Sequence, residues 1–166
     1  ACRSVKLQNF QYRIIQRVIT CNHWLFIANL KDSPNCQCGK DDTIEHFFYY
    51  CKYNTEFWQA LMEWGKSTLN LDFEMNIIDV IFGYEGNEPK VNVNVSNFIL
   101  IPAKKYVHDE KLKQKSLHFP TFLSLLKYEI ELEKLIYSRA DKLEVFEYKW
   151  NFVYLKKCML DHTLHA

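Results

Sequence analysis

Apolar residues recur three and four positions apart along most of this chain, which is the spacing of one face of an α-helix. The first stripe contains Phe10, Ile14 and Val18 and predicts a helix over residues 8–20. We expect an all-α protein of six to seven helices, because the same periodicity returns in later segments. Those segments are residues 23–30, 54–70, 75–83, 96–115, 120–138 and 141–158.

The helical periodicity is lost in residues 84–94, where glycine, proline and asparagine favour a loop. We place a subdomain boundary in this loop, between a helical subdomain over residues 7–83 and a second one over residues 95–158. At the end of the loop, Val91 and Val93 alternate with asparagines, which is a weak indication of a strand or of extended loop.

Four residues predict where the C-terminal helices begin or bend. Ser96 and Asp141 carry side chains of the kind that cap helix N-termini. Pro120 stands at the start of its helical pattern, a position that helices tolerate. Pro102 lies inside a pattern, so we expect it to kink or break that helix.

Three cysteines and one histidine lie within sixteen residues, in the spacing C-x-C-x7-H-x4-C. They are Cys36, Cys38, His46 and Cys51. Zinc prefers such soft ligands, and four protein ligands form a closed, structural tetrahedral site. Gly39 follows the first pair, where a turn around a metal often requires a positive φ. The sequence therefore predicts a zinc-knuckle turn between the second and third helices.

Two other interpretations of these cysteines stay open. In one, the four residues are unrelated, since free cysteine is a common buried residue that behaves as a small hydrophobe. In the other, Cys21 or His23 replaces a ligand, because C-x-C gives a tighter bite than the C-x2-C or longer spacing of most zinc knuckles.

The remaining cysteines bear on the compartment, because the chain has six in all. No signal-peptide pattern is found in residues 1–30, and no apolar run approaches the roughly 18 residues of a membrane span. We therefore expect a reducing location, nuclear or cytoplasmic, with no secretion and no membrane partner, where clustered cysteines indicate a metal. His162 and His165 are expected to belong to an unstructured tail.

The formal net charge of +1 argues for no particular partner, but the charges are unevenly distributed. Residues 1–31 contain five basic residues and no acidic one. Arg13 and Arg17, four positions apart on the first helix, form either a solvated face or a phosphate-contacting face. Lys104 and Lys105 belong to a basic helix that leaves the same two alternatives open.

Motifs of the common enzyme classes are absent from this sequence. It has no phosphate-cradling glycine-rich loop, no HExxH zinc motif and no nucleophile elbow. Asp41 and Asp42 are adjacent and expected to be solvated rather than to hold catalytic metals. Cys51 near His46 resembles a nucleophile and base, but shared metal ligation explains the same residues better. We therefore expect a binding or structural module rather than an enzyme.

Several stretches resemble the zinc-binding region that follows the polymerase in reverse transcriptases of non-LTR (LINE-type) retrotransposons. The resemblance covers about residues 7–150. It rests on an Arg-containing helix, a Thr-x-Asn-x2-Leu step from Thr20 to Leu25, an "ETIEHLF-like" segment and a Phe-Trp pair at Phe57. Towards the C-terminus it continues with Ala103-Lys104-Lys105-Tyr106-Val107, a helix from Phe122 to Glu133 and Lys149-Trp150. In this family the first cysteine pair is usually C-x2-C, and the helix that Pro102 interrupts here is usually continuous.

The resemblance implies that the chain is the C-terminal end of a retrotransposon polyprotein, outside the polymerase and endonuclease. It implies Zn2+ as cofactor, held by Cys36, Cys38, His46 and Cys51. The expected role is to grip template RNA or target DNA, with the polymerase domain of the polyprotein as a further partner. The alternative is a helical scaffold that packs on the polymerase without touching nucleic acid.

Six residues are predicted to make the nucleic-acid contacts. The basic ones would bind phosphate, and the two aromatic ones would stack on single-stranded bases. They are Arg13, Arg17, Lys104 and Lys105, with Tyr12 and Trp24 as the stacking residues.

Overall fold

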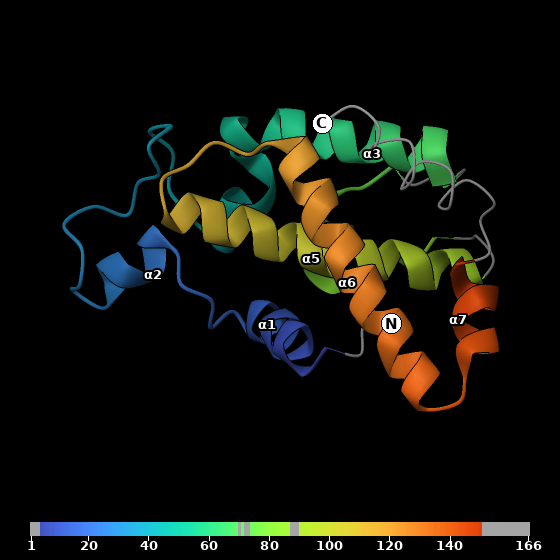
Figure 1. Cartoon of the computed structure of the whole chain (residues 1–166). Coiled ribbons are helices and arrows are strands. Elements are labelled where there is room, and N and C mark those ends of the chain that lie inside the picture. The colour runs from blue at the N-terminus through green and yellow to red at the C-terminus, as the bar shows by residue number, and fades with distance from the viewer. Residues whose placement is uncertain (1–3, 70, 72–73, 87–89, 151–166) are drawn as a thin grey trace.

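The computed structural model describes residues 4–69, 71, 74–86 and 90–150 (Figure 1). In this part of the chain the secondary structure is helical, which confirms the all-α prediction. The elements are α1 (Val5–Ile15), α2 (Asn22–Ile27), η1 (His46–Tyr50), η2 (Lys52–Asn54), α3 (Thr55–Leu69), α4 (Ile77–Phe82), α5 (Lys90–Leu112), α6 (Phe119–Arg139) and α7 (Leu143–Trp150). None of the described helices has the length and apolar character that a membrane span requires.

Helix α5 is the element around which the others pack. It contacts α1, α6, α7 and η1, and Figure 1 shows it crossing the middle of the molecule. A helix with apolar side chains on all sides is stable only in a protein interior. The long buried run in α5 has this property: Val95, Phe98, Ile99, Leu100, Ala103, Tyr106 and Val107 are each at most 5% exposed.

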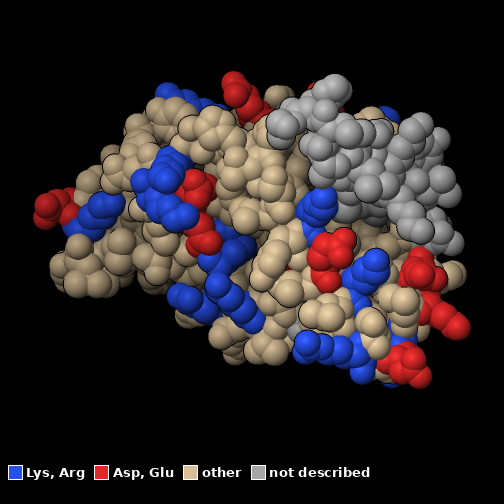
Figure 2. Space-filling model, viewed as in Figure 1, with Lys and Arg blue, Asp and Glu red and all other residues tan. Residues whose placement is uncertain are grey.

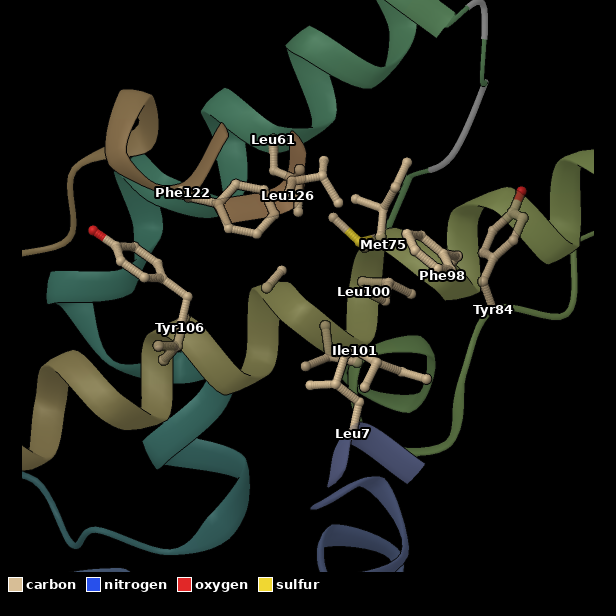
Figure 3. Packing of buried hydrophobic residues seen from close by; sticks show 14 of the residues in the cluster. Leu7, Leu61, Met75, Tyr84, Phe98, Leu100, Ile101, Tyr106, Phe122 and Leu126 are labelled. Atoms are coloured by element: carbon tan, nitrogen blue, oxygen red, sulfur yellow. The ribbon is translucent and has the colours of Figure 1, made fainter. Parts of the chain in front are cut away.

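Aromatic residues of α3, α5 and α6 pack together in the core, and Figure 3 shows two of them, Tyr106 and Phe122. The ring of Phe57 lies 5.3 Å from that of Phe122 and 5.6 Å from that of Tyr106, in the edge-on and tilted arrangements that aromatic pairs prefer. The aromatic stripe of residues 54–70 is therefore core. Residues from both predicted subdomains belong to this one cluster, and the boundary between them stays a prediction.

The first helix begins and ends earlier than its apolar stripe suggests. Ser4 caps α1 by accepting a hydrogen bond from the backbone N–H of Leu7, and the helix ends at Ile15. Arg17 follows with a φ of 58°, a left-handed conformation that stops a helix. Val18 is therefore 60% exposed, and the prediction of a helix to residue 20 is wrong.

Helix α5 also corrects three expectations. It begins at Lys90, so the predicted loop ends earlier and Val91 and Val93 are helical rather than extended. Ser96 lies buried in its interior and does not cap it. The helix continues through Pro102 without a break. Packing on several sides compensates for the backbone hydrogen bond that a proline removes.

The C-terminal helices agree with prediction except at one cap. Pro120 occupies the first turn of α6, as expected. Asp141 has a φ of 52° in the turn before α7, which begins two residues later. The predicted extension of the last helix to residue 158, together with His162 and His165, lies outside the described residues.

A buried ion pair joins α6 to α7. The Lys149 Nζ lies 2.8 and 2.9 Å from the two carboxylate oxygens of Glu133, and the Trp150 Nε1 donates to the same carboxylate at 2.7 Å. Glu133 is 3% exposed. A buried charge needs such partners to offset its lost hydration, so the three residues fix how α7 packs on α6.

Candidate metal centre

The four predicted ligands lie together. One donor atom from each of Cys36, Cys38, His46 and Cys51 falls within 4.8 Å of all the others. The Sγ atoms of Cys36 and Cys51 are 3.7 Å apart, and the Cys38 Sγ is 3.1 Å from the His46 Nε2. Three of the residues are buried and Cys38 is half-buried. These residues can hold a metal ion.

The distance between the Sγ atoms of Cys36 and Cys51 fits a tetrahedral shell. Two sulfurs bound at about 2.3 Å from one ion in a tetrahedron lie about 3.8 Å from each other. The Cys36 to Cys51 distance of 3.7 Å matches this value and is far longer than the bond of a disulfide. Four protein donors also leave no open coordination position, which is the pattern of a structural site.

A tight hairpin holds the first ligand pair. The Cys36 backbone N–H donates to the Lys40 carbonyl at 2.8 Å, and the Gly39 N–H donates to the Cys36 carbonyl at 2.9 Å. Gly39 has the predicted positive φ, 88°, which most other residues adopt only with strain. An isolated antiparallel bridge between Asn35 and Asp41 closes the hairpin. The short C-x-C spacing is therefore compatible with both thiols reaching one site.

The second ligand pair belongs to a wider helical turn. Thr43 caps the start of this segment, because its Oγ1 accepts from the His46 N–H at 3.3 Å. Segment η1 is a π-helical turn, in which the Cys51 N–H donates to the His46 carbonyl five residues back, at 3.1 Å. Such turns are rare in proteins, and those that occur are often found at functional sites. This one brings the fourth ligand to the histidine.

The wide turn leaves the carbonyls of Phe47 and Phe48 to be satisfied by side chains. Asn54 donates to the Phe47 carbonyl at 2.9 Å, and the Trp58 Nε1 donates to the Phe48 carbonyl at 2.7 Å. Lys111, from the end of α5, donates to the Phe47 carbonyl at 3.0 Å. These contacts fix His46 and Cys51 rigidly to the core. The sequence pattern did not reveal them, because Lys111 lies 64 residues from Phe47.

Burial favours the neutral forms of Cys36 and His46. Burial raises the pKa of the Cys36 thiol to about 11, which disfavours the thiolate when no cation is present. Burial, followed by the charge of Lys111, lowers the pKa of His46 and keeps its imidazole neutral, the form that ligates metals. A divalent ion would compensate for the burial of the thiolates.

Helix α2 is attached to the site by polar contacts. The Asn22 N–H donates to Asp42 at 3.1 Å, and the Asn22 side chain donates to the Asn35 carbonyl at 2.8 Å. Asp42 is 2% exposed and lies 3.6 Å from the Lys111 Nζ, so the expectation that it is solvated is wrong. An anionic side chain at the first turn of α2 also suits the helix dipole.

Neither alternative ligand joins the four-residue group. Cys21 is a buried free thiol, and burial raises its pKa. The His23 Nδ1 lies 2.9 Å from Asp41. Within the described residues the cluster contains the four residues of the spacing motif and neither of these two.

Four of the six residues predicted to bind nucleic acid are on the surface. Tyr12 and Trp24 are 61% and 43% exposed, and Arg13 is exposed as well. Arg17 is also exposed, but it does not share a helical face with Arg13, because α1 ends before it. Its guanidinium instead pairs with Glu45 at 2.6 Å.

The two lysines predicted on α5 do not form a basic face. Lys104 is 1% exposed and donates to the side chain of Gln11, so it cannot contact phosphate in this structure. Burial lowers its pKa to about 7. Lys105 is half-buried, pairs with Asp109 and lies over the ring of Phe10. The sequence pattern did not predict the burial of Lys104, because a lysine on a helix is normally expected to be exposed.

The comparisons with known proteins do not change this description. No family model, curated protein or solved structure matches the chain.

Proposed function

We propose that this chain is a zinc-stabilised nucleic-acid-binding module from the C-terminal end of a retrotransposon reverse transcriptase. The observation that carries the proposal is the four-ligand cluster, which follows a basic, acid-free N-terminal segment in the chain. The resemblance of several stretches to the zinc-binding region of non-LTR reverse transcriptases supports the retrotransposon origin. The proposed partners are RNA or DNA and the polymerase domain of the polyprotein.

Zinc is the proposed ion because of the donor set. Three thiolates and one imidazole suit zinc better than magnesium or calcium, which prefer oxygen ligands. A closed shell gives the ion a structural role and leaves no position for water or substrate. We accordingly propose that the chain itself is not an enzyme.

Metal content tests this part directly. Elemental mass spectrometry of the purified chain should find about one zinc per chain, and the Cys36→Ser variant should lose it. Cys21→Ala is the matched control, because this buried thiol lies outside the cluster. Equal zinc in the parent and Cys36→Ser would overturn the proposed ligand set.

The nucleic-acid part rests on the surface of residues 4–31. Arg13, Arg17 and Lys31 are exposed there, no acidic residue lies among them, and Tyr12 and Trp24 present exposed rings. Basic side chains bind phosphate, and exposed rings stack on unpaired bases. Because Arg17 is already paired with Glu45, the main phosphate contact of this surface is assigned to Arg13.

Fluorescence anisotropy with single-stranded RNA and DNA tests this part. The parent should bind at low salt, and Arg13→Glu/Arg17→Glu should weaken binding at least tenfold. Lys134→Glu/Lys142→Glu is the control, since both lysines are exposed and lie on α6 and in the turn after it. Parent binding no tighter than that of a neutral control protein would overturn the proposal.

A helical scaffold that docks on the polymerase is the second candidate. It is favoured by α2, which buries none of its side chains and exposes Phe26 and Ile27, with Leu30 just beyond. If the charge-reversed Arg13→Glu/Arg17→Glu variant bound RNA as well as the parent, and Phe26→Ser/Leu30→Ser lost binding to the polymerase domain, this second candidate would replace the first.

A further inference from the structure

A cleft of about 570 Å³ lies beside the metal centre. Its walls come from the start of α2, the first-ligand hairpin, η2 and the C-terminal end of α5 with the residues that follow it. Figure 1 shows this end of α5 pointing towards α2. The cleft thus forms where three segments far apart in the sequence meet, next to the metal ligand Cys36.

Four lysines line the cleft. They are Lys31, Lys52, Lys111 and Lys115, against two acidic residues, Asp42 and Glu56. Basic side chains gather towards the α2 side of the face drawn in Figure 2, with some acidic ones among them. None of the four lysines belongs to the set predicted from the sequence, because they come from three segments that are far apart in the chain.

The lysine at the base of the cleft has a structural role. The Lys111 side chain is 13% exposed, donates to the Phe47 carbonyl and lies near the buried carboxylate of Asp42. This pair is close to neutral. The excess positive charge of the cleft is therefore supplied by the three exposed lysines, with Glu56 as the remaining acidic residue.

The three exposed lysines are available to a ligand. Lys31 donates to the neutral side chain of Asn22, and Lys52 lies 5.2 Å above the ring of Tyr53. Among the described residues, the side chain of Lys115 makes no hydrogen bond or ion pair, although its backbone N–H donates to the Glu110 carbonyl. The contacts of these three side chains therefore leave their charges unpaired with carboxylates.

An exposed aromatic ring stands at the same place. Tyr53 lines the cleft and is 55% exposed, although most of the neighbouring aromatic side chains are packed in the core. A ring beside lysines offers one surface for a base and cationic groups for the adjoining phosphates. This combination distinguishes the cleft from a general basic surface.

We propose that this cleft binds the backbone of single-stranded nucleic acid, with Lys31, Lys52 and Lys115 on phosphates and Tyr53 stacked on a base. The inference rests on the proposed nucleic-acid function and adds a second contact region to the surface of residues 4–31. A volume of about 570 Å³ encloses one or two nucleotides, and the exposed ring of Tyr53 favours an unpaired strand, whose bases are free to stack. Because the ligand hairpin forms one wall, the metal ion also shapes the cleft.

The salt dependence of RNA binding tests the phosphate contacts. Anisotropy titrations of a single-stranded RNA would compare the parent with Lys31→Ala/Lys52→Ala/Lys115→Ala and with the control Lys90→Ala/Lys134→Ala/Lys142→Ala. Each phosphate contact contributes about 0.7 to the slope of log K against log salt for a single strand, so the cleft variant should lose about 2 from that slope. The control should keep the parental slope.

The outcomes separate this inference from the proposed function. If the parent binds and both triple variants retain its slope and affinity, the cleft assignment is overturned while the function stands. If the parent does not bind, both are overturned. Zinc content and thermal unfolding of each variant, expected to equal those of the parent, show that the fold is intact.

Substitution of the aromatic residue tests the stacking contact separately. Tyr53→Leu should weaken binding of an unpaired strand about tenfold, and duplex RNA of the same length should bind weakly to the parent and the variant alike. Tyr148→Leu is the control, because Tyr148 is 75% exposed on α7. Equal affinity of Tyr53→Leu and the parent, or tighter binding of duplex than of single strand, would overturn the assignment.

Discussion

Two regions of this molecule are held together by different interactions. In the knuckle segment, defined here as residues 21–43, only Cys21, Cys36 and Asp42 are buried, and its contacts are polar. Helix α5, by contrast, buries twelve residues. The first region has too little apolar contact to hold its conformation by packing, whereas the second does so without any ligand.

The candidate metal centre connects the two regions. Cys36 and Cys38 belong to the knuckle segment, whereas His46 and Cys51 belong to a turn packed in the core. An ion held by all four would therefore attach a weakly packed loop to a rigid scaffold. The comparison teaches that ligation can replace a hydrophobic core locally, as it does in small metal-dependent domains.

Of the substitutions proposed here, removal of a metal ligand should have the largest effect, and it should destabilise the knuckle segment but not α5. Cys38→Ser should abolish stoichiometric metal binding, because metal binding stabilises small structural sites by about 10–16 kcal/mol in zinc-finger peptides. Limited proteolysis should then cut within residues 21–43 at least tenfold faster, while α5 and α6 stay intact. The account is contradicted if the cleavage sites and rates match those of the parent.

A core substitution should give the reverse result. Phe122 is fully buried, and Phe122→Ala should lower the free energy of unfolding by about 3–5 kcal/mol through lost packing and a cavity. Urea titration measures the loss, and elemental analysis of the folded variant should still find one metal ion per chain. If Phe122→Ala lost its metal ion but kept the stability of the parent, the proposed independence of the two regions would be contradicted.

The buried ammonium group of Lys104 should make the stability of the core depend on pH. Because burial lowers the pKa of Lys104 to about 7, the unfolded chain binds more protons than the folded chain between pH 7 and its ordinary pKa. Stability contributed at this site therefore rises with pH across that window, by an amount on the order of a few kcal/mol.

Comparison of Lys104→Met with the parent isolates this effect. The variant should be more stable than the parent at pH 7, and the difference should shrink by pH 9, as measured by urea unfolding. A difference that stays constant with pH would show that the ammonium is not desolvated.

The smallest effect is expected for the surface pair between Arg17, after the end of α1, and Glu45, before the start of η1. Arg17 and Glu45 are 2.6 Å apart but have side-chain exposures of 50% and 31%. Exposed pairs contribute about 0–1 kcal/mol, so Arg17→Ala should lower the unfolding free energy by no more than that. A loss above about 2 kcal/mol in urea titration would make this pair part of the attachment between the regions.

The sequence predicted the features that depend on neighbours along the chain. Helical periodicity indicated α3 and α6, and the spacing of Cys36 to Cys51 indicated the ligand cluster, because all four donors come from one short segment. The positive φ of Gly39 follows from the same local reasoning.

Features set by distant contacts were missed. The apolar residues Val18 and Ile19 extended the stripe of α1 beyond the residue at which tertiary structure ends it. The valines near Lys90 are helical because packing overrides their strand preference. The burial of Lys104, and the lysine-lined cleft, depend on elements that only folding brings together.

Hydrogen exchange of the backbone, with the metal bound and after chelation, tests the central claim most directly. The account predicts that chelation speeds exchange in residues 21–43 while α5 and α6 keep their protection. Unchanged exchange throughout would contradict it, because the knuckle segment would then hold its structure without the ion. Equal loss of protection in all helices would also contradict it, because the core would then depend on the metal.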